Sequence, residues 1–273
     1  MKFVEMLKAR WRAADTLLCV GLDPDPEHFP EHLRCTDDSI FEFCKSIVDA
    51  TAEFVCAFKP QIAYFASAGA EDALQRLIVY IREAHPAVPV ILDAKRGDIA
   101  STAQHYAREV FERYNAHAVT LSPYLGFDSI EPYLAYADRG AFLLCRTSNP
   151  GSDDLQMLDT DGDRLYERVA RLAHAWNRGG QLGLVVGATY PYELASVREL
   201  VGEMPLLVPG IGAQGGHVEA SVKAGQTADG AGIVLNSSRA IIYASQHDDF
   251  AAAARRAAQS ARDEINRYRL ATV

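Results

Sequence analysis

Residues 89–98 read Pro-Val-Ile-Leu-Asp-Ala-Lys-Arg-Gly-Asp, so a continuous apolar run ends abruptly in charged residues. Such a run is typical of a parallel strand covered on both faces, because a strand with one face in water alternates apolar and polar residues. Asp93 and Lys95 are two positions apart, and side chains at that spacing project from the same face of a strand. The stretch therefore predicts a buried parallel strand with a charged carboxyl end.

Apolar runs of the same kind recur along the whole chain, separated by stretches with helical periodicity. Eight such runs, alternating with helices, fit right-handed strand-helix-strand units that close into a barrel. We therefore predict an α/β fold, a (β/α)8 TIM barrel, with residues 1–273 forming one catalytic domain. A doubly wound open sheet is the structural alternative. Besides residues 89–95, the runs are Leu17–Asp23, Cys56–Ile62, Ala118–Pro123, Ala141–Ser148, Gly183–Thr189, Pro205–Gly212 and Gly232–Asn236.

The segments between the runs are expected to be helices and loops. Met1–Arg12 places Phe3, Leu7 and Trp11 on one face, so we expect a helix that closes the bottom of the barrel. Pro24–Asp38 is rich in proline and is expected to be a long loop, and Ser152–Asp163 is expected to be a surface loop. Further helices are expected over Phe41–Glu53, Ser101–Asn115 and Phe250–Arg269.

The composition excludes several classes of protein. The chain has 273 residues, 49% of them hydrophobic, and 27 Lys and Arg against 36 Asp and Glu give a net charge of −9. Nonspecific binding to nucleic acid or anionic membranes needs clustered Lys and Arg, so neither partner is expected. The five cysteines form no Cys-x-x-Cys pair, and no apolar run approaches the roughly 18 residues of a membrane span. With no signal or transit peptide evident, we expect a cytoplasmic protein.

Charged residues gather at the carboxyl ends of the first three predicted strands, where TIM barrels carry their active sites. They are Asp23, Lys59, Asp93, Lys95, Arg96 and Asp98. Lys59, Asp93, Lys95 and Asp98 would alternate in sign and neutralise one another at the mouth of the barrel. A salt-bridge cluster that only ties strands together is the alternative, but buried ion pairs stabilise poorly because desolvation offsets the Coulomb gain. The array therefore indicates an active site.

The array suggests proton chemistry on a negatively charged substrate. A lysine flanked by carboxylates keeps its proton, so Lys95 is suited to act as an acid rather than to form a Schiff base. Asp93 would repel an anionic substrate group beside it, and the repulsion would end if that group left as carbon dioxide. The larger share of catalysis would come from Lys95, which would stabilise and then protonate negative charge on carbon. Gly97 would supply the backbone freedom of the following turn.

A second informative cluster follows the last two predicted strands. Pro209–Gly216 is rich in glycine, and residues 236–239 read Asn-Ser-Ser-Arg. These loops form the usual phosphate site of TIM barrels, where backbone N–H groups approach the anion, and Gln214 and Arg239 would add donors. After the fifth strand, the polar turn Arg146–Gly151 could cap a helix or contact a ligand's ring. No histidine or cysteine spacing is typical of a metal site, so no metal is expected.

Together these motifs resemble the orotidine 5′-phosphate decarboxylase family, specifically its longer bacterial subgroup, type 2. The resemblance implies a (β/α)8 barrel that converts orotidine 5′-monophosphate to UMP and carbon dioxide without a metal or organic cofactor. The motifs occur in the family's order over nearly the whole chain. They are Gly21–Pro24, Phe58–Pro60, Asp93–Ile99 with Ser101 and Thr102, Thr147–Gly151, Pro209–Gly216 and Ser238–Arg239.

The resemblance also implies a role for each matching residue. Lys95 would protonate C6 of the pyrimidine, and Asp93 would lie beside the departing carboxylate. Lys59 and Asp23 would hold ribose hydroxyls and complete the charged array. Ser148 would contact the pyrimidine ring, Gln214 and Arg239 would hold the phosphate, and Asp98 and Thr102 would reach across the interface of a homodimer. No role is assigned to Asn149 or to the Pro24–Asp38 loop.

Two other functions are considered. A magnesium-dependent sugar-phosphate decarboxylase or aldolase of the same superfamily needs an acidic metal ligand at the end of the second strand, where this chain has Lys59. A non-catalytic barrel that binds phosphate ligands would need the phosphate loops but not the Lys/Asp array. The array argues against both.

Overall fold

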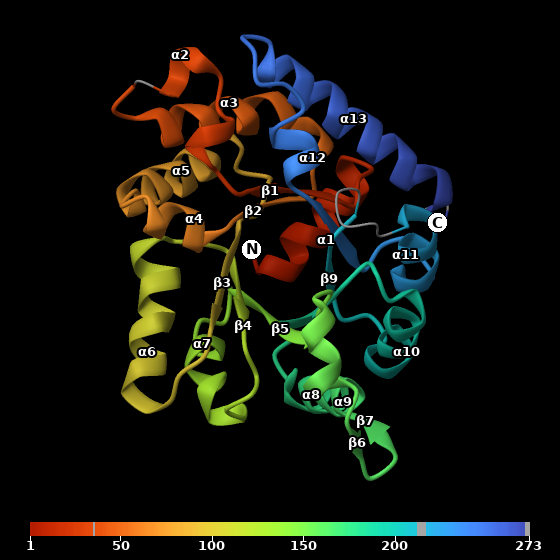
Figure 1. The fold of residues 1–273 in the computed structure, drawn as a ribbon. Coiled ribbons are helices and arrows are strands. Elements are labelled where there is room, and N and C mark those ends of the chain that lie inside the picture. Colours follow the sequence, from red (N-terminus) through yellow and green to blue (C-terminus); the bar gives the residue numbers. More distant parts are fainter. Residues whose placement is uncertain (35, 212–216, 271–273) are drawn as a thin grey trace.

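The computed structural model describes residues 1–34, 36–211 and 217–270, and its main sheet is a closed barrel (Figure 1). Its eight parallel strands, as far as the chain is described, are β1 (Leu18–Leu22), β2 (Ala57–Pro60), β3 (Ile91–Arg96), β4 (Ala118–Leu121), β5 (Gly140–Arg146), β8 (Leu182–Val186), β9 (Leu206–Pro209) and β10 (Ile233–Ser237). Their order is β2-β1-β10-β9-β8-β5-β4-β3. Parallel bridges from Phe58 to Val90 and from Gln61 to Asp93 join the two ends. The predicted TIM barrel is thus confirmed, and the open doubly wound sheet is wrong.

Amphipathic helices surround the barrel. In α5 (Glu71–Ala84), for example, Leu74, Leu77, Ile78 and Ile81 are buried, at the spacing that puts them on one face of a helix. The other long helices are α3 (Ser39–Thr51), α6 (Ala100–Arg108), α9 (Leu165–Trp176), α10 (Pro191–Val201), α11 (Val218–Gly225) and α13 (Phe250–Tyr268). The shorter ones are α2 (Glu31–Arg34), α4 (Ile62–Ser67), α7 (Glu131–Leu134), α8 (Asp153–Gln156) and α12 (Arg239–Ile242).

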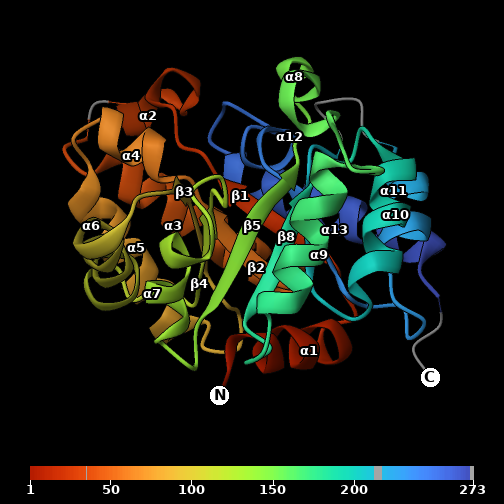
Figure 2. The same cartoon turned by 90° about the horizontal axis from the view of Figure 1, so that it is seen from below.

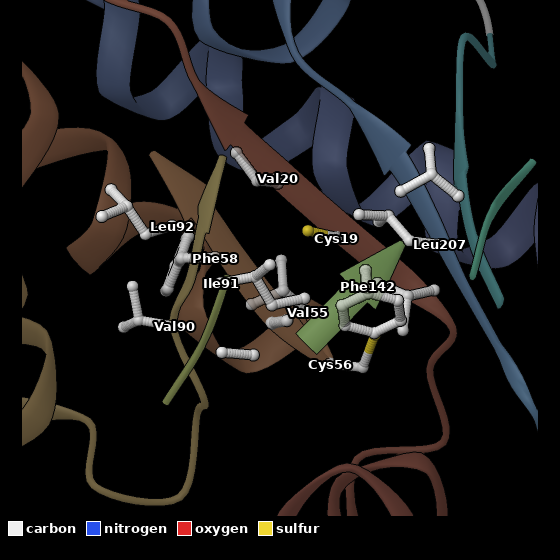
Figure 3. Packing of buried hydrophobic residues seen from close by; sticks show 14 of the residues in the cluster. Cys19, Val20, Val55, Cys56, Phe58, Val90, Ile91, Leu92, Phe142 and Leu207 are labelled. Carbon is white, nitrogen blue, oxygen red and sulfur yellow. The ribbon is translucent and has the colours of Figure 1, made fainter. Parts of the chain in front are cut away.

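Buried apolar side chains pack on both faces of the barrel strands (Figure 3). Val20, Phe58, Ile91, Phe142 and Leu207 are at most 1% exposed, which excludes water and gives the strands a rigid common core. The cysteines that the structure describes, Cys19, Cys44, Cys56 and Cys145, are buried free thiols. Burial raises the pKa of the Cys56 thiol to about 12, so this thiol is unreactive at neutral pH.

Helix α1 (Phe3–Ala13) lies at the end of the barrel opposite α8 (Figure 2). Its buried face includes Phe3, whose ring meets that of Phe142 edge to face at 5.8 Å. The backbone N–H of Phe3 donates to the carbonyl of Asp138 at 2.9 Å, and a Cβ at Gly140 would lie 2.2 Å from the Phe3 ring. The helix is therefore fitted closely against the amino ends of the strands.

Two segments expected to be loops contain regular structure. Within Pro24–Asp38, Pro26–His28 forms a 3-10 turn capped by the Asp25 side chain, and α2 follows. Within Ser152–Asp163, α8 leads into a hairpin of β6 (Asp159–Thr160) and β7 (Asp163–Arg164). Each element is too short to show a hydrophobic period, so the sequence pattern did not reveal it.

The helix expected over Ser101–Asn115 is α6, which continues into a π-helical turn over Glu109–Arg113. Among the described residues, no helix is both long enough and apolar enough to cross a membrane.

The packing of α1 generates the first prediction. Phe3 is 2% exposed, so Phe3→Ala leaves a cavity beside Phe142 and should lower the free energy of unfolding by about 3–5 kcal/mol. Urea denaturation followed by circular dichroism measures the change. Tyr192→Ala, at a position 88% exposed, is the matched control and should leave the midpoint nearly unchanged. Equal midpoints for the two variants would contradict this packing account.

Candidate active site

A cavity of about 650 Å³ opens at the carboxyl ends of the strands. All eight barrel strands contribute to its lining, either from the strand or from the residues directly after it. Of the residues predicted from the sequence, the lining includes Asp23, Lys59, Asp93, Lys95, Ser148 and Arg239. The structure thus brings both predicted clusters, the charged array and the phosphate side, into one cavity.

Asp93 is the centre of the charged array. Its Oδ2 accepts a hydrogen bond from Lys59 Nζ at 2.7 Å, and its Oδ1 accepts one from Lys95 Nζ at 2.6 Å. The side chains of Lys59 and Asp93 are 5% and 9% exposed, whereas that of Lys95 is 47% exposed. One buried carboxylate therefore anchors two ammonium groups, of which only that of Lys95 stands well out into the cavity.

Neighbouring charges keep the array ionised. Burial would raise the pKa of the Asp93 carboxyl, but the ammonium groups of Lys59 and Lys95 outweigh burial and hold this pKa well below its usual range. Burial would lower the pKa of Lys59, but Asp93 and Asp23 outweigh it and raise this pKa. The stabilisation by Asp93 is lost only as pH falls through its lowered pKa, and that by Lys59 only as pH rises through its raised pKa. Asp93 and Lys59 therefore stay charged around neutral pH.

Thr120 of β4 orients Asp93 and the backbone that carries Lys95. Its hydroxyl donates to Asp93 Oδ1 at 2.8 Å and accepts from the backbone N–H groups of Ala94 and Lys95, each at 3.0 Å. These bonds use the one hydrogen and both lone pairs of the hydroxyl. Sequence reasoning missed Thr120, and its only signal was a lone polar residue inside an apolar run.

The backbone at Lys95 is left-handed, with φ of 45°, and the register between β3 and β4 shifts between Leu92 and Arg96. This conformation is costly for a residue with a Cβ, on the order of 1 kcal/mol or more, and is common where a side chain must be aimed at a functional site. The expectation that Gly97 would supply the flexible backbone is wrong, because the positive φ values fall at Lys95 and Ala100.

Asp23 follows β1 and is held through its backbone. Tyr243, just after α12, donates its hydroxyl hydrogen to the Asp23 carbonyl at 2.7 Å and accepts from the Asp25 N–H at 2.6 Å. Within the described part of the chain, Asp23 Oδ1 is buried without a hydrogen-bond partner. A Cβ at Gly21 would lie 1.9 Å from Ser238 Oγ, so only glycine lets the ends of β1 and β10 approach this closely. This approach brings Asp23 and Arg239 to the same cavity.

The predicted phosphate side is partly described. Arg239 lines the cavity and is exposed, and no carboxylate among residues 1–34, 36–211 and 217–270 pairs with it. Gly210, with φ of 99°, also lines the cavity after β9. Gln214 lies outside the described residues. Arg239 therefore offers a ligand in the cavity a guanidinium that no carboxylate of the described residues occupies.

Arg146, at the end of β5, organises the opposite wall. It is 1% exposed, its Nη2 donates to Asp153 Oδ1 at 2.6 Å, and Nη1 donates to Ser152 Oγ. Its guanidinium carbon also lies 3.8 Å from the ring centroid of Tyr190. Arg146 thus holds the start of α8 against the end of β5. Sequence reasoning treated this turn as either a cap or a ligand contact and missed this tethering role.

Further bonds hold the same wall beside Ser148, which lines the cavity. Gln156 accepts from the Thr147 N–H at 2.8 Å and donates to the Thr147 hydroxyl at 2.9 Å. Asn149 also lines the cavity, and its Oδ1 accepts from the Thr147 hydroxyl at 2.7 Å. The side-chain oxygen of Asn149 is therefore engaged within its own turn.

Three residues that the sequence analysis singled out do not reach the cavity of their own chain. Asp98 accepts from the backbone N–H of Ile99 at 2.8 Å and does not line the cavity. Thr102 is exposed on α6. Arg96 forms two hydrogen bonds with Glu109, at 3.0 and 2.9 Å, and points away from the site. Asp98 therefore does not join the charged array of its own chain.

The side chains of the site include ammonium and guanidinium groups as well as carboxylates. Nowhere in the described chain do three His, Cys, Asp or Glu side chains gather closely enough to hold a metal ion. At the end of β2, where a metal-dependent relative would need an acidic ligand, the Lys59 ammonium is bound to Asp93. Lys95 and Arg239 line the same cavity, so they are suited to bind an anionic ligand there. The Asp93 carboxylate lines this cavity too and would lie beside the ligand.

Comparisons with a family model and with known proteins point to the same family. A family model described as "Orotidine 5'-phosphate decarboxylase / HUMPS family" matches residues 16–257. The chain is 64% identical over 270 residues to orotidine 5'-phosphate decarboxylase of Dechloromonas aromatica, covering 98% of this chain and 100% of that protein. It is 65% identical to the protein of the same name from Cupriavidus necator, covering 98% and 99%.

Solved structures agree. The structure of Leishmania donovani OMP decarboxylase superposes with a TM-score of 0.85 at 43% sequence identity and covers 98% of each chain. A structure of a putative orotidine-monophosphate-decarboxylase from Toxoplasma gondii gives a TM-score of 0.84 at 36% identity, covering 96% and 98%. From its motifs, its barrel and these relatives, the chain belongs to the orotidine 5′-phosphate decarboxylase / HUMPS family.

Proposed function

We propose that the protein catalyses the decarboxylation of orotidine 5′-monophosphate to UMP and carbon dioxide, a step of pyrimidine biosynthesis. The observation that carries this proposal is the Lys59–Asp93–Lys95 array, with its carboxylate buried between two ammonium groups at 2.7 and 2.6 Å. The chain's extensive identity with relatives named for this activity supports the same substrate.

The array fits the electronic demand of this reaction. When the C6 carboxylate leaves as carbon dioxide, the electron pair of the broken bond stays on C6, in the plane of the ring. That pair is orthogonal to the π system, so the ring carbonyls do not delocalise it, and a fixed positive charge must stabilise it. The Lys95 ammonium stabilises the pair and transfers a proton to C6, which completes UMP. Lys95 then regains a proton from solvent.

Asp93 supports this step in two ways. Its carboxylate lies beside the substrate carboxylate, so their repulsion disappears when carbon dioxide departs. It also holds the Lys95 ammonium through a 2.6 Å hydrogen bond, so the proton donor is already positioned before substrate binds. The larger contribution comes from Lys95, because that charge acts on the transition state itself.

The remaining residues bind the substrate. Lys59 and Asp23 hold the ribose hydroxyls, and Ser148 contacts the pyrimidine. Arg239, together with Gln214, binds the 5′-phosphate, for which a planar guanidinium is well suited. The phosphate does not react, but its binding supplies energy that holds C6 close to Lys95. The route uses no cofactor and no metal.

We propose further that the chain forms one catalytic domain and works in the cytoplasm as a homodimer, with Asp98 and Thr102 of each subunit entering the partner's site. Asp98 does not line the cavity of its own chain. Exposed apolar residues follow β3 and β4 near it, with Ile99 51% and Tyr124 80% exposed. Apolar surface of this kind is typical of a subunit interface. The four described cysteines are free thiols, as in a reducing compartment.

The proton-donor role generates a prediction. Lys95→Ala should abolish turnover of orotidine 5′-monophosphate, because both the stabilising charge and the transferred proton are lost. The loss of pyrimidine absorbance in the presence of a chelator measures the reaction. Lys223→Ala, at an exposed position on α11, is the matched lysine control and should retain full activity. Near-normal turnover by the Lys95 variant would refute the mechanism.

The shared site generates another prediction. Lys95→Ala and Asp98→Ala proteins should each be nearly inactive, but mixing them under conditions that exchange subunits should restore about a quarter of the wild-type activity. About half of the dimers then contain one subunit of each variant. In each of these dimers, one of the two sites carries neither substitution. As a control, a variant that carries both substitutions is mixed with wild-type protein. This mixture shows whether subunits exchange. If mixing restores no activity although exchange is shown, Asp98 does not act across the interface.

A further inference from the structure

A second cavity, of about 400 Å³, lies at the opposite end of the barrel from the candidate active site. Helix α1 forms one wall with Met6 and Ala9, and the other walls come from residues around the amino ends of β3, β4 and β5. Figure 2 shows this end, with α1 below the strands and α8 at the far end. Nothing in the proposed reaction uses this basal cavity.

The lining of the basal cavity carries excess positive charge. Arg10, Arg82 and Arg139 contribute guanidinium groups, and Asp138 contributes the one carboxylate of the lining. Asp138 Oδ2 lies 3.6 Å from Arg139 Nε, and among the residues that the structure describes no carboxylate forms an ion pair with Arg10 or Arg82. The guanidinium groups of the lining therefore outnumber its carboxylates by two.

Two of these guanidinium groups are fixed in place by the backbone. Arg10 Nε donates to the Val55 carbonyl at 2.8 Å, and Arg139 Nη1 donates to the Ala116 carbonyl at 2.9 Å. Arg10 Nη2 also donates to the Ala52 carbonyl, and Arg139 Nη2 donates to Asn115 Oδ1 at 2.9 Å. A guanidinium has five N–H donors, so each group keeps others for a ligand. The cationic groups are thus held ready and do not need to be ordered when a ligand binds.

The surroundings of the His117 ring lack a hydrogen-bond acceptor. Its Nδ1 accepts from the backbone N–H of Val90 at 3.0 Å, and the side chain is buried. Burial, followed by the charges of Arg82 and Arg139, lowers the pKa of His117 to about 3, so the ring is neutral. A neutral imidazole has one acceptor nitrogen, and the other nitrogen, Nε2, must carry the hydrogen. Nε2 nevertheless faces Arg82 Nη1 at 2.5 Å, so two donors meet with no acceptor between them.

We propose that the basal cavity binds a small tetrahedral oxyanion through Arg82, Arg139, Arg10 and His117. The oxyanion is inorganic phosphate or the phosphate group of a small phosphorylated metabolite. One oxygen accepts from both Arg82 and His117 Nε2, which then move apart to hydrogen-bond distances from it. The guanidinium groups match phosphate oxygens in charge and geometry, and Met6 and Ala9 of α1 offer an apolar wall for the non-phosphate part of an ester.

Isothermal titration calorimetry with inorganic phosphate tests this site. The titrated protein carries Arg239→Gln, which removes the guanidinium at the candidate active site. We expect one phosphate site per chain in this background, at least tenfold weaker binding when Arg82→Met is added, and an intermediate affinity with Arg82→Lys. Arg76→Met, on the same helix α5 but outside the cavity, is the matched control and should leave the affinity unchanged.

A parallel titration with glycerol 1-phosphate distinguishes the two sources of the anion. Tighter binding than inorganic phosphate would assign the cavity to a phosphorylated metabolite, and weaker binding would assign it to free phosphate. The proposal is overturned if the Arg239→Gln protein binds neither anion, or if the Arg82 and Arg76 variants bind equally well. Decarboxylation by the single Arg82→Met variant should remain normal, which separates this test from the proposed reaction and shows that the variant is folded.

Discussion

The site depends on one constraint, a buried carboxylate between two ammonium groups. Asp93 receives Lys59 on one oxygen and Lys95 on the other. Removing one partner of such a buried group costs about 3–5 kcal/mol, because a charge is left without compensation. The three residues lie on β2 and β3, and Lys59 can reach Asp93 only because the sheet closes between these strands, where Gln61 bridges to Asp93. The charged array therefore forms only when the barrel closes.

The two ends of the barrel serve different purposes. At the carboxyl end, the strands present two ammonium groups held on one carboxylate, which leaves positive charge for an anionic substrate, and Arg146 and Tyr243 fix the loops that surround the array. At the amino end, α1 covers the strands through Phe3 and leaves a cavity lined by guanidinium groups. The strands between them are packed on both faces by buried residues such as Phe58 and Phe142, which gives the barrel a rigid core. A ligand at the amino end is thus expected to stabilise the fold without entering the reaction.

Much of this architecture could be predicted because it rests on local patterns. Continuous apolar runs identified all eight barrel strands, and the spacing of two between Asp93 and Lys95 placed their side chains together. What could not be predicted depends on contacts between distant segments. Thr120 looks like an ordinary strand threonine until β4 lies beside β3, and Arg146 looks like a turn residue until α8 folds back on it. The left-handed backbone at Lys95 was also hidden, since glycine was the natural expectation and tertiary bonds to Thr120 hold the strained residue instead.

The central claim is that the Lys95 ammonium exchanges a proton with C6 of the pyrimidine. Microscopic reversibility makes this step testable without carbon dioxide, because the group that protonates C6 also removes that proton from bound UMP. The measurement is the proton NMR signal of C6–H while UMP is incubated with the protein in D2O. We expect the signal to fade with wild-type protein and to persist with Lys95→Ala. A C6–H signal that persists with wild-type protein that still turns over orotidine 5′-monophosphate would contradict it.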